Sequence, residues 1–111
     1  MKLVYPAIFY PYESGDGYVV EFPDLPGCIT QGESIEEAFE MAADAASGWI
    51  FTSIEEGEDL PKPSSDLKIS DFEDAVLINY ILLDMDYLIV LLNIKNYLLR
   101  KKKKEHLRNL I

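Results

Sequence analysis

The alternation of apolar and polar positions predicts a β-sheet in the first third of the chain. Residues 18–22 place every second side chain on one face, which is the period of a strand with one face buried. Residues 2–10 form the opening strand, with Leu3, Tyr5, Ala7 and Phe9 on one face and Val4, Pro6, Ile8 and Tyr10 on the other. The polar, glycine-bearing segment between them, residues 12–17, predicts an antiparallel hairpin. Pro6 favours an edge position for the first strand, or a place where no ladder hydrogen bond is needed. A short third strand, residues 28–31, completes a three-stranded antiparallel meander.

Helical periodicity begins at residue 35. Ser34 and Glu37, three residues apart, form a capping box, and apolar positions then recur at helical spacing to about residue 56, where Gly57 fits a C-terminal cap. The buried stripe is expected to hold Ile35, Ala38, Phe39, Ala42, Ala46, Trp49, Ile50 and Ser53. We therefore expect its aromatic side chains to pack in the core rather than to bind a ligand.

A turn-rich connector, residues 58–71, leads to a continuous apolar segment, residues 74–86. This segment is consistent with a strand buried on both faces, although periodicity alone does not separate such a strand from a buried helix.

The turn between the second and third strands carries a recognisable motif. It reads Phe22-Pro23-Asp24-Leu25-Pro26-Gly27-Cys28, and Thr30, Gly32, Ser34, Glu37 and Ala38 follow at fixed spacing. This pattern resembles the HicB-like antitoxin family of bacterial type II toxin–antitoxin systems, over roughly the first two thirds of the chain. The resemblance implies an α+β fold in the order β-β-β-α-β, similar to a partial ribonuclease H fold that lacks the catalytic carboxylates. It also implies that a fourth strand returns beside the first.

The resemblance divides the chain into a HicB-like α/β domain, residues 1–86, and a C-terminal helix or tail, residues 87–111, which is apolar and then basic. The mainly apolar stretch 87–99 has thirteen residues and is interrupted by Lys95, so it is too short for a membrane span, which needs roughly twenty apolar residues. No helix-turn-helix or ribbon-helix-helix pattern follows the domain, so DNA binding is not expected. Nonspecific contact of the basic run with nucleic-acid phosphates remains an alternative for this tail. We favour a helix that packs on another copy of the chain and makes a dimer or tetramer.

Charge is distributed unevenly along the chain. Residues 1–74 hold 17 acidic residues against 3 lysines, which leaves −14, whereas residues 75–111 hold 3 acidic residues against 7 basic ones, which leaves +4. An acidic body repels phosphates and attracts basic proteins, although acids of this kind also serve solubility alone. The start of the chain, residues 1–6, lacks the long apolar segment and the small-residue cleavage site of a signal peptide, so we expect a cytoplasmic protein.

Together these features predict an antitoxin that binds and masks a small basic toxin, which by the resemblance is a HicA-like mRNA-cleaving protein. The expected contact residues are Phe22, Pro23, Asp24, Leu25, Pro26, Gly27 and Cys28 of the loop, with Glu33, Glu36, Glu37 and Glu40 of the helix start. Alternatives are a ribonuclease H-like RNA hydrolase and a solitary oligomeric domain without a toxin partner.

No residue pattern indicates catalysis, a cofactor or a metal. The carboxylates of Asp16, Glu21 and Asp24 are not expected to converge, and Asp24 is expected to cap its own turn. Cys28 is interpreted as a small buried thiol with no base near it, and His106 as a surface residue of the basic tail.

Overall fold

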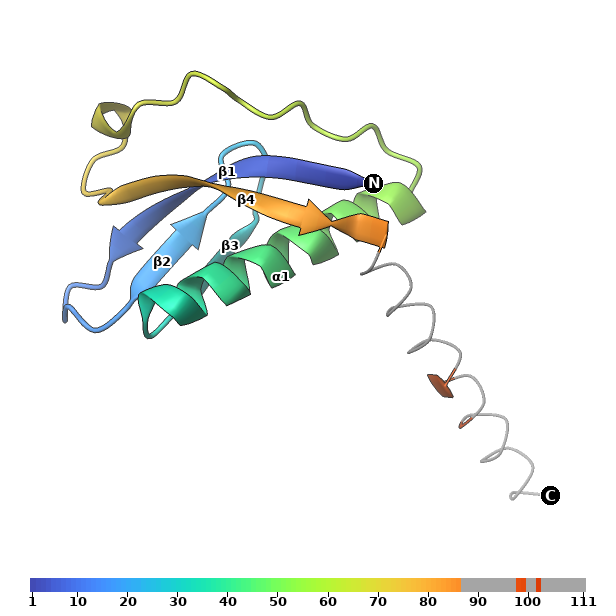
Figure 1. The fold of residues 1–111 in the computed structure, drawn as a ribbon, viewed down its shortest axis with the longest axis horizontal. Coiled ribbons are helices and arrows are strands. Elements are labelled where there is room, and N and C mark those ends of the chain that lie inside the picture. The colour runs from blue at the N-terminus through green and yellow to red at the C-terminus, as the bar shows by residue number, and fades with distance from the viewer. Residues whose placement is uncertain (87–97, 100–101, 103–111) are drawn as a thin grey trace.

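The computed structural model describes residues 1–86, 98, 99 and 102. The predicted C-terminal helix and tail, residues 87–111, therefore lie outside the described residues apart from these three positions. The described elements, in chain order, are β1 (Lys2–Pro11), β2 (Tyr18–Glu21), β3 (Ile29–Gly32), α1 (Ile35–Glu55), the short 3₁₀ helix η1 (Ile69–Asp71) and β4 (Leu77–Asp84). The predicted α+β class and the order β-β-β-α-β are confirmed (Figure 1).

The four strands form one antiparallel sheet in the order β3-β2-β1-β4. The meander and the return of β4 beside β1 are confirmed. The edge position that Pro6 favoured for the first strand is wrong, because β1 lies between β2 and β4. The second alternative for Pro6 fits the register. β2 reaches only as far as Ile8, which lies opposite Glu21, so Pro6 has a strand neighbour on one side only, opposite Tyr80 of β4.

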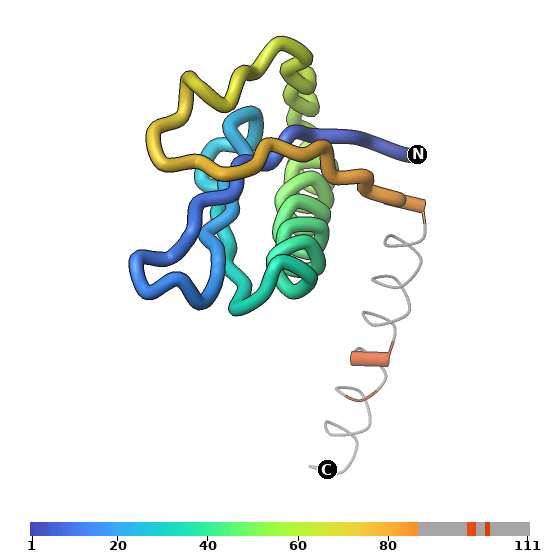
Figure 2. Tube along the Cα trace, turned by 60° about the vertical axis from the view of Figure 1, so that its left-hand side comes forward, coloured from blue at the N-terminus to red at the C-terminus, as the bar shows by residue number. Residues whose placement is uncertain are grey.

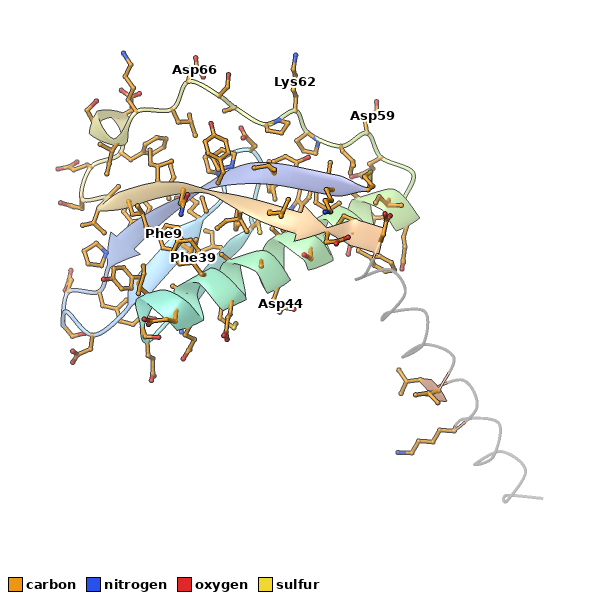
Figure 3. All side chains as sticks on the ribbon, viewed as in Figure 1. Phe9, Phe39, Asp44, Asp59, Lys62 and Asp66 are labelled. Carbon is orange, nitrogen blue, oxygen red and sulfur yellow. The ribbon has the colours of Figure 1, made fainter. Side chains whose placement is uncertain are left out.

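Helix α1 packs against one face of the sheet and creates the core between them. The ring centroids of Phe9 in β1 and Phe39 in α1 lie 4.8 Å apart at an interplanar angle of 36° (Figure 3). Alanines at three successive turns of α1 are fully buried and let the helix approach the sheet closely. The approach is tightest at Gly32, where a Cβ atom would run into the backbone of Ala38.

The helix begins and ends with the capping residues that the sequence predicts. The Ser34 hydroxyl accepts a hydrogen bond from the Glu37 backbone N–H at 3.1 Å. At the other end Gly57 has a φ of 71°, its N–H donates to the Ile54 carbonyl at 3.1 Å, and the Glu58 N–H donates to Ser53 at 2.9 Å. These two bonds form a Schellman motif, which satisfies two of the last carbonyls of the helix.

The prediction that the last strand is buried on both faces is wrong. Ile81 and Leu83 of β4 face α1 and are 5% and 0% exposed, whereas Tyr80 and Leu82 on the opposite face are 46% and 59% exposed. α1 covers only one face of the sheet, and the connector runs on the other side of the sheet from α1 (Figure 1). The long apolar segment is therefore a strand with one buried face and one partly open face.

The two ends of the described domain lie side by side. The Met85 N–H donates to the Met1 carbonyl at 2.9 Å, and the Met1 amino group pairs with the Asp86 carboxylate. The tube in Figure 2 shows the chain start next to the end of β4. Within the part of the chain that the structure describes, no helix is both long enough and apolar enough to cross a membrane.

Candidate functional site

The motif loop between β2 and β3 is closed by its own backbone. The Leu25 N–H donates to the Phe22 carbonyl at 3.1 Å, the Cys28 N–H donates to Leu25 at 2.9 Å, and the Phe22 N–H donates to Cys28 at 3.1 Å. The side chains of these three residues are at most 5% exposed and belong to the core under α1. Three of the seven predicted loop contacts therefore shape the loop and do not present side chains at its surface.

The other four loop residues reach the surface. Pro26 and Gly27 are exposed, and Gly27 adopts a φ of 82°, a left-handed conformation that favours glycine. Pro23 and Asp24 are half-buried. The predicted capping of its own turn by Asp24 is wrong, because its carboxylate accepts hydrogen bonds from the backbone N–H and the hydroxyl of Ser64, at 2.8 Å and 2.6 Å.

The connector is anchored near this loop by two tyrosine hydroxyls. Tyr5 donates to the Pro61 carbonyl at 2.6 Å, and Tyr80 donates to the Ser64 carbonyl at 3.0 Å. Burial raises the pKa of Tyr5, and the negative charge of Asp24 raises it further. The Tyr5 hydroxyl therefore keeps its proton and its role as a donor well above neutral pH.

The structure does not bring the predicted acidic residues together with the loop. The carboxylates of Glu33, Glu36, Glu37 and Glu40 are all exposed around the start of α1. The loop instead meets the second half of α1, where the Trp49 indole N–H donates to the Pro26 carbonyl at 3.0 Å. Thirteen residues of helix separate Glu36 from Trp49, which at 1.5 Å per residue is about 20 Å. The predicted site is thus two separate surfaces at the two ends of the helix.

The second surface contains a groove that sequence reasoning missed. It has a volume of about 470 Å³ and lies between the motif loop, the start of β3 and the C-terminal half of α1. Its lining residues are Gly27, Cys28, Ile29, Ala45, Gly48, Trp49, Thr52, Ser53, Glu56 and Glu58. Trp49, expected in the core, is half-buried and lines this groove. A glycine in the middle of the helix and acidic residues at its end are the sequence signals that point here.

The groove carries no activated nucleophile. Burial raises the pKa of the Cys28 thiol to about 11, so the thiol stays protonated at neutral pH. Among the residues that the structure describes, no three His, Cys, Asp or Glu side chains gather closely enough to hold a metal ion. Asp16 lies in the turn after β1, Glu21 ends β2, and Asp24 is bound to Ser64.

Comparison with known proteins gives consistent matches. Residues 5–96 match the family described as HicB_like antitoxin of bacterial toxin-antitoxin system. Antitoxin HicB 1 of Photorhabdus laumondii is 46% identical over 59 residues, which is 53% of this chain and 37% of that protein. Antitoxin HicB of Escherichia coli K12 is 42% identical over 60 residues, which is 54% of this chain and 43% of that protein. The chain thus matches less than half of the length of these two relatives.

Two solved structures extend the likeness to the fold. A chain of a toxin–antitoxin complex from Streptococcus pneumoniae superimposes with a TM-score of 0.66 at 30% identity, over 78% of this chain and 72% of that one. The N-terminal domain of the Burkholderia pseudomallei antitoxin HicB gives a TM-score of 0.58 at 28% identity, over 74% of this chain and 96% of that one. The match over residues 5–96 covers most of the chain, and the chain therefore belongs to the HicB-like antitoxin family.

Proposed function

We propose that this chain is the antitoxin of a toxin–antitoxin pair and that it binds and masks a small, basic, mRNA-cleaving toxin without catalysing a reaction itself. The observation that carries the proposal is the likeness, at 30% identity over 78% of the chain, to a chain of the Streptococcus pneumoniae toxin–antitoxin complex. Two named antitoxins among the curated relatives point to the same function.

The surface chemistry of the described domain supports a basic partner. Exposed carboxylates gather at both ends of α1, and none of them takes part in the ion pair that Met1 forms with Asp86. The net charge of −14 over residues 1–74 would steer a cationic protein toward this surface and raise its association rate.

The proposal is tested with the small basic protein encoded beside this chain. RNA cleavage by that protein is measured alone and with increasing amounts of this chain, and we expect cleavage to stop at a fixed stoichiometric ratio. A neighbour that cleaves RNA equally well with an excess of this chain would overturn the proposal. Size-exclusion chromatography of the mixture, with each protein alone as control, shows whether loss of cleavage reflects a complex.

A parallel arm incubates this chain alone with RNA and magnesium. Cleavage that Asp16→Asn or Asp24→Asn abolishes would assign a ribonuclease H-like hydrolase instead. A stable homo-oligomer that neither cleaves RNA nor binds the neighbour would assign a solitary oligomeric domain. Oligomerisation through the C-terminal helix of residues 87–111 stays a prediction, and the same chromatography of the full chain measures it.

A further inference from the structure

The groove beside Trp49 is open at Gly48, a helix position where a larger side chain could have filled it. Gly48 sits in the middle of α1 without a positive φ, and a Cβ atom built on it would meet nothing within 4 Å. Apart from proline, glycine is the residue least suited to a helix interior. Neither the backbone conformation nor the packing of the described chain requires glycine at this position. Its effect on the structure is to leave the floor of the groove free for a group from another molecule.

The rim of the groove is negative and is not neutralised within the described domain. Glu55, Glu56, Glu58 and Asp59 surround the C-terminal end of α1, where the helix dipole is itself negative and where cations are normally preferred. The last turn contains no basic residue, and among residues 1–86 no ion pair involves these four acids. Glu56 and Glu58 line the groove, so a cation bound there would meet two carboxylates and a helix C-terminus.

The wall of the groove is a fixed aromatic ring. The hydrogen bond from the Trp49 indole N–H to the Pro26 carbonyl, 3.0 Å long, holds the ring against the motif loop. An indole is the best aromatic partner for a cation that stacks on it. A planar guanidinium can stack on such a ring and also donate to two carboxylates, whereas an ammonium group offers only a point charge.

From these features we infer that the groove receives an arginine side chain of a basic protein partner, stacked on Trp49 and paired with Glu56 and Glu58. The inference rests on the proposed function for the identity of that partner, the toxin. The volume of about 470 Å³ falls within the range of small-molecule pockets, about 300–1,000 Å³, so a complete side chain can enter.

Trp49 is the only tryptophan of the chain, so its indole N–H resonance reports on the groove directly. The chain of 111 residues is titrated by NMR with the peptide acetyl-Gly-Arg-Gly-amide at low salt, and with acetyl-Gly-Gln-Gly-amide as the neutral control. We expect a saturable shift of the Trp49 signal with the arginine peptide only. No saturable shift, or the same shift with both peptides, would overturn the inference.

Two variants of the groove make the test specific. Gly48→Met puts a helix-favouring side chain into the open floor and should abolish the shift. Glu56→Gln combined with Glu58→Gln should weaken peptide binding about three- to tenfold. Glu36→Gln combined with Glu40→Gln removes the same charge from the other end of α1 and should leave peptide binding within twofold of wild type. Equal binding by all three variants would contradict the assigned site.

The toxin assay separates this inference from the proposed function. If wild type fails to inhibit the neighbouring protein, the proposed function fails, whatever the peptide does. If wild type inhibits it and Gly48→Met inhibits it equally well, the groove is not the toxin contact and the inference is wrong while the function stands. We expect Gly48→Met to inhibit at least tenfold less well, with circular dichroism showing the same helix content as wild type.

Discussion

The carboxylate of Asp24 holds Ser64 through both of its oxygen atoms, with Oδ2 2.8 Å from the backbone nitrogen and Oδ1 2.6 Å from the hydroxyl. The two residues are 40 positions apart and tie the motif loop to the connector. The turn itself is closed by backbone hydrogen bonds, so Asp24 is free to make this distant contact. The most recognisable acid of the motif therefore has a structural role that is independent of any partner.

We expect Asp24→Ala to lower the free energy of unfolding by about 1–3 kcal/mol, because it removes two charge-assisted hydrogen bonds and leaves the Ser64 N–H without its acceptor. Ser64→Ala removes only one of the bonds and should cost less. Urea denaturation of both single variants and the double variant gives the coupling energy, and Ser65→Ala is the control on an exposed neighbour. A coupling energy near zero would contradict a stabilising contact between Asp24 and Ser64.

Gly48→Ala should stabilise the protein by up to about 1 kcal/mol, because alanine favours the helix and its Cβ atom enters open space. Gly32→Ala should do the opposite, since its Cβ atom would run into the backbone of Ala38 and force the helix away from the sheet. Thermal unfolding of the two variants measures this contrast. Destabilisation by Gly48→Ala would show that the described chain needs glycine there.

The Cys28 thiol should make stability depend on pH in the alkaline range. Its pKa rises from 9.0 to about 11 on folding, so between these values the unfolded chain loses a proton that the folded chain keeps. The free energy of unfolding should therefore fall from pH 9 to pH 11, by up to roughly 2–3 kcal/mol, and be unaffected by this group below pH 8. Tyrosines titrate in the same range, so the measurement is the difference from Cys28→Ala, in which this slope should be absent.

The acids at the start of α1 should govern the rate of toxin capture. Reversing Glu33, Glu36 and Glu40 to lysine should slow association about tenfold and flatten its dependence on salt, because steering by opposite charge is lost. Stopped-flow mixing with the basic neighbour at several ionic strengths measures both effects.

Reversal of Asp66, Asp71 and Glu73, which lie between α1 and β4, is the matched control, with the same change in net charge. Equal slowing by both triple variants would mean that only the total charge matters.

The meander of β1 to β3, the helix and its caps could be predicted because each depends on local sequence, whereas the return of β4 beside β1 was implied only by the family resemblance. The alternation in β2 and the spacing from Ser34 to Gly57 are visible in the chain itself. The burial of β4 could not be predicted, because both of its faces are apolar in sequence and only the position of α1 decides which one is covered. The edge position predicted from Pro6 was wrong for a similar reason, since the sequence does not show that β2 ends before it reaches Pro6.

The contact residues stay a prediction, but how they are arranged in space could be anticipated less well than the fold, for two physical reasons. The motif that identifies the family includes core residues, such as Phe22 and Leu25, whose spacing serves packing. The second reason is the length of α1, which separates the acids at its start from the loop and brings Trp49 to it instead. Trp49 and Pro26 are 23 residues apart, and the sequence gave no indication that they would meet.

The pairing of Met1 with Asp86 also has a mechanical consequence. β1 and β4 run antiparallel, with Lys2 opposite Asp84, so the two ends of the domain leave the sheet at the same corner. A force that pulls these ends apart would load the ladder one rung at a time, like a zipper, instead of shearing all its hydrogen bonds together. Pulled in this way, the domain should yield at a lower force than its thermodynamic stability alone would indicate.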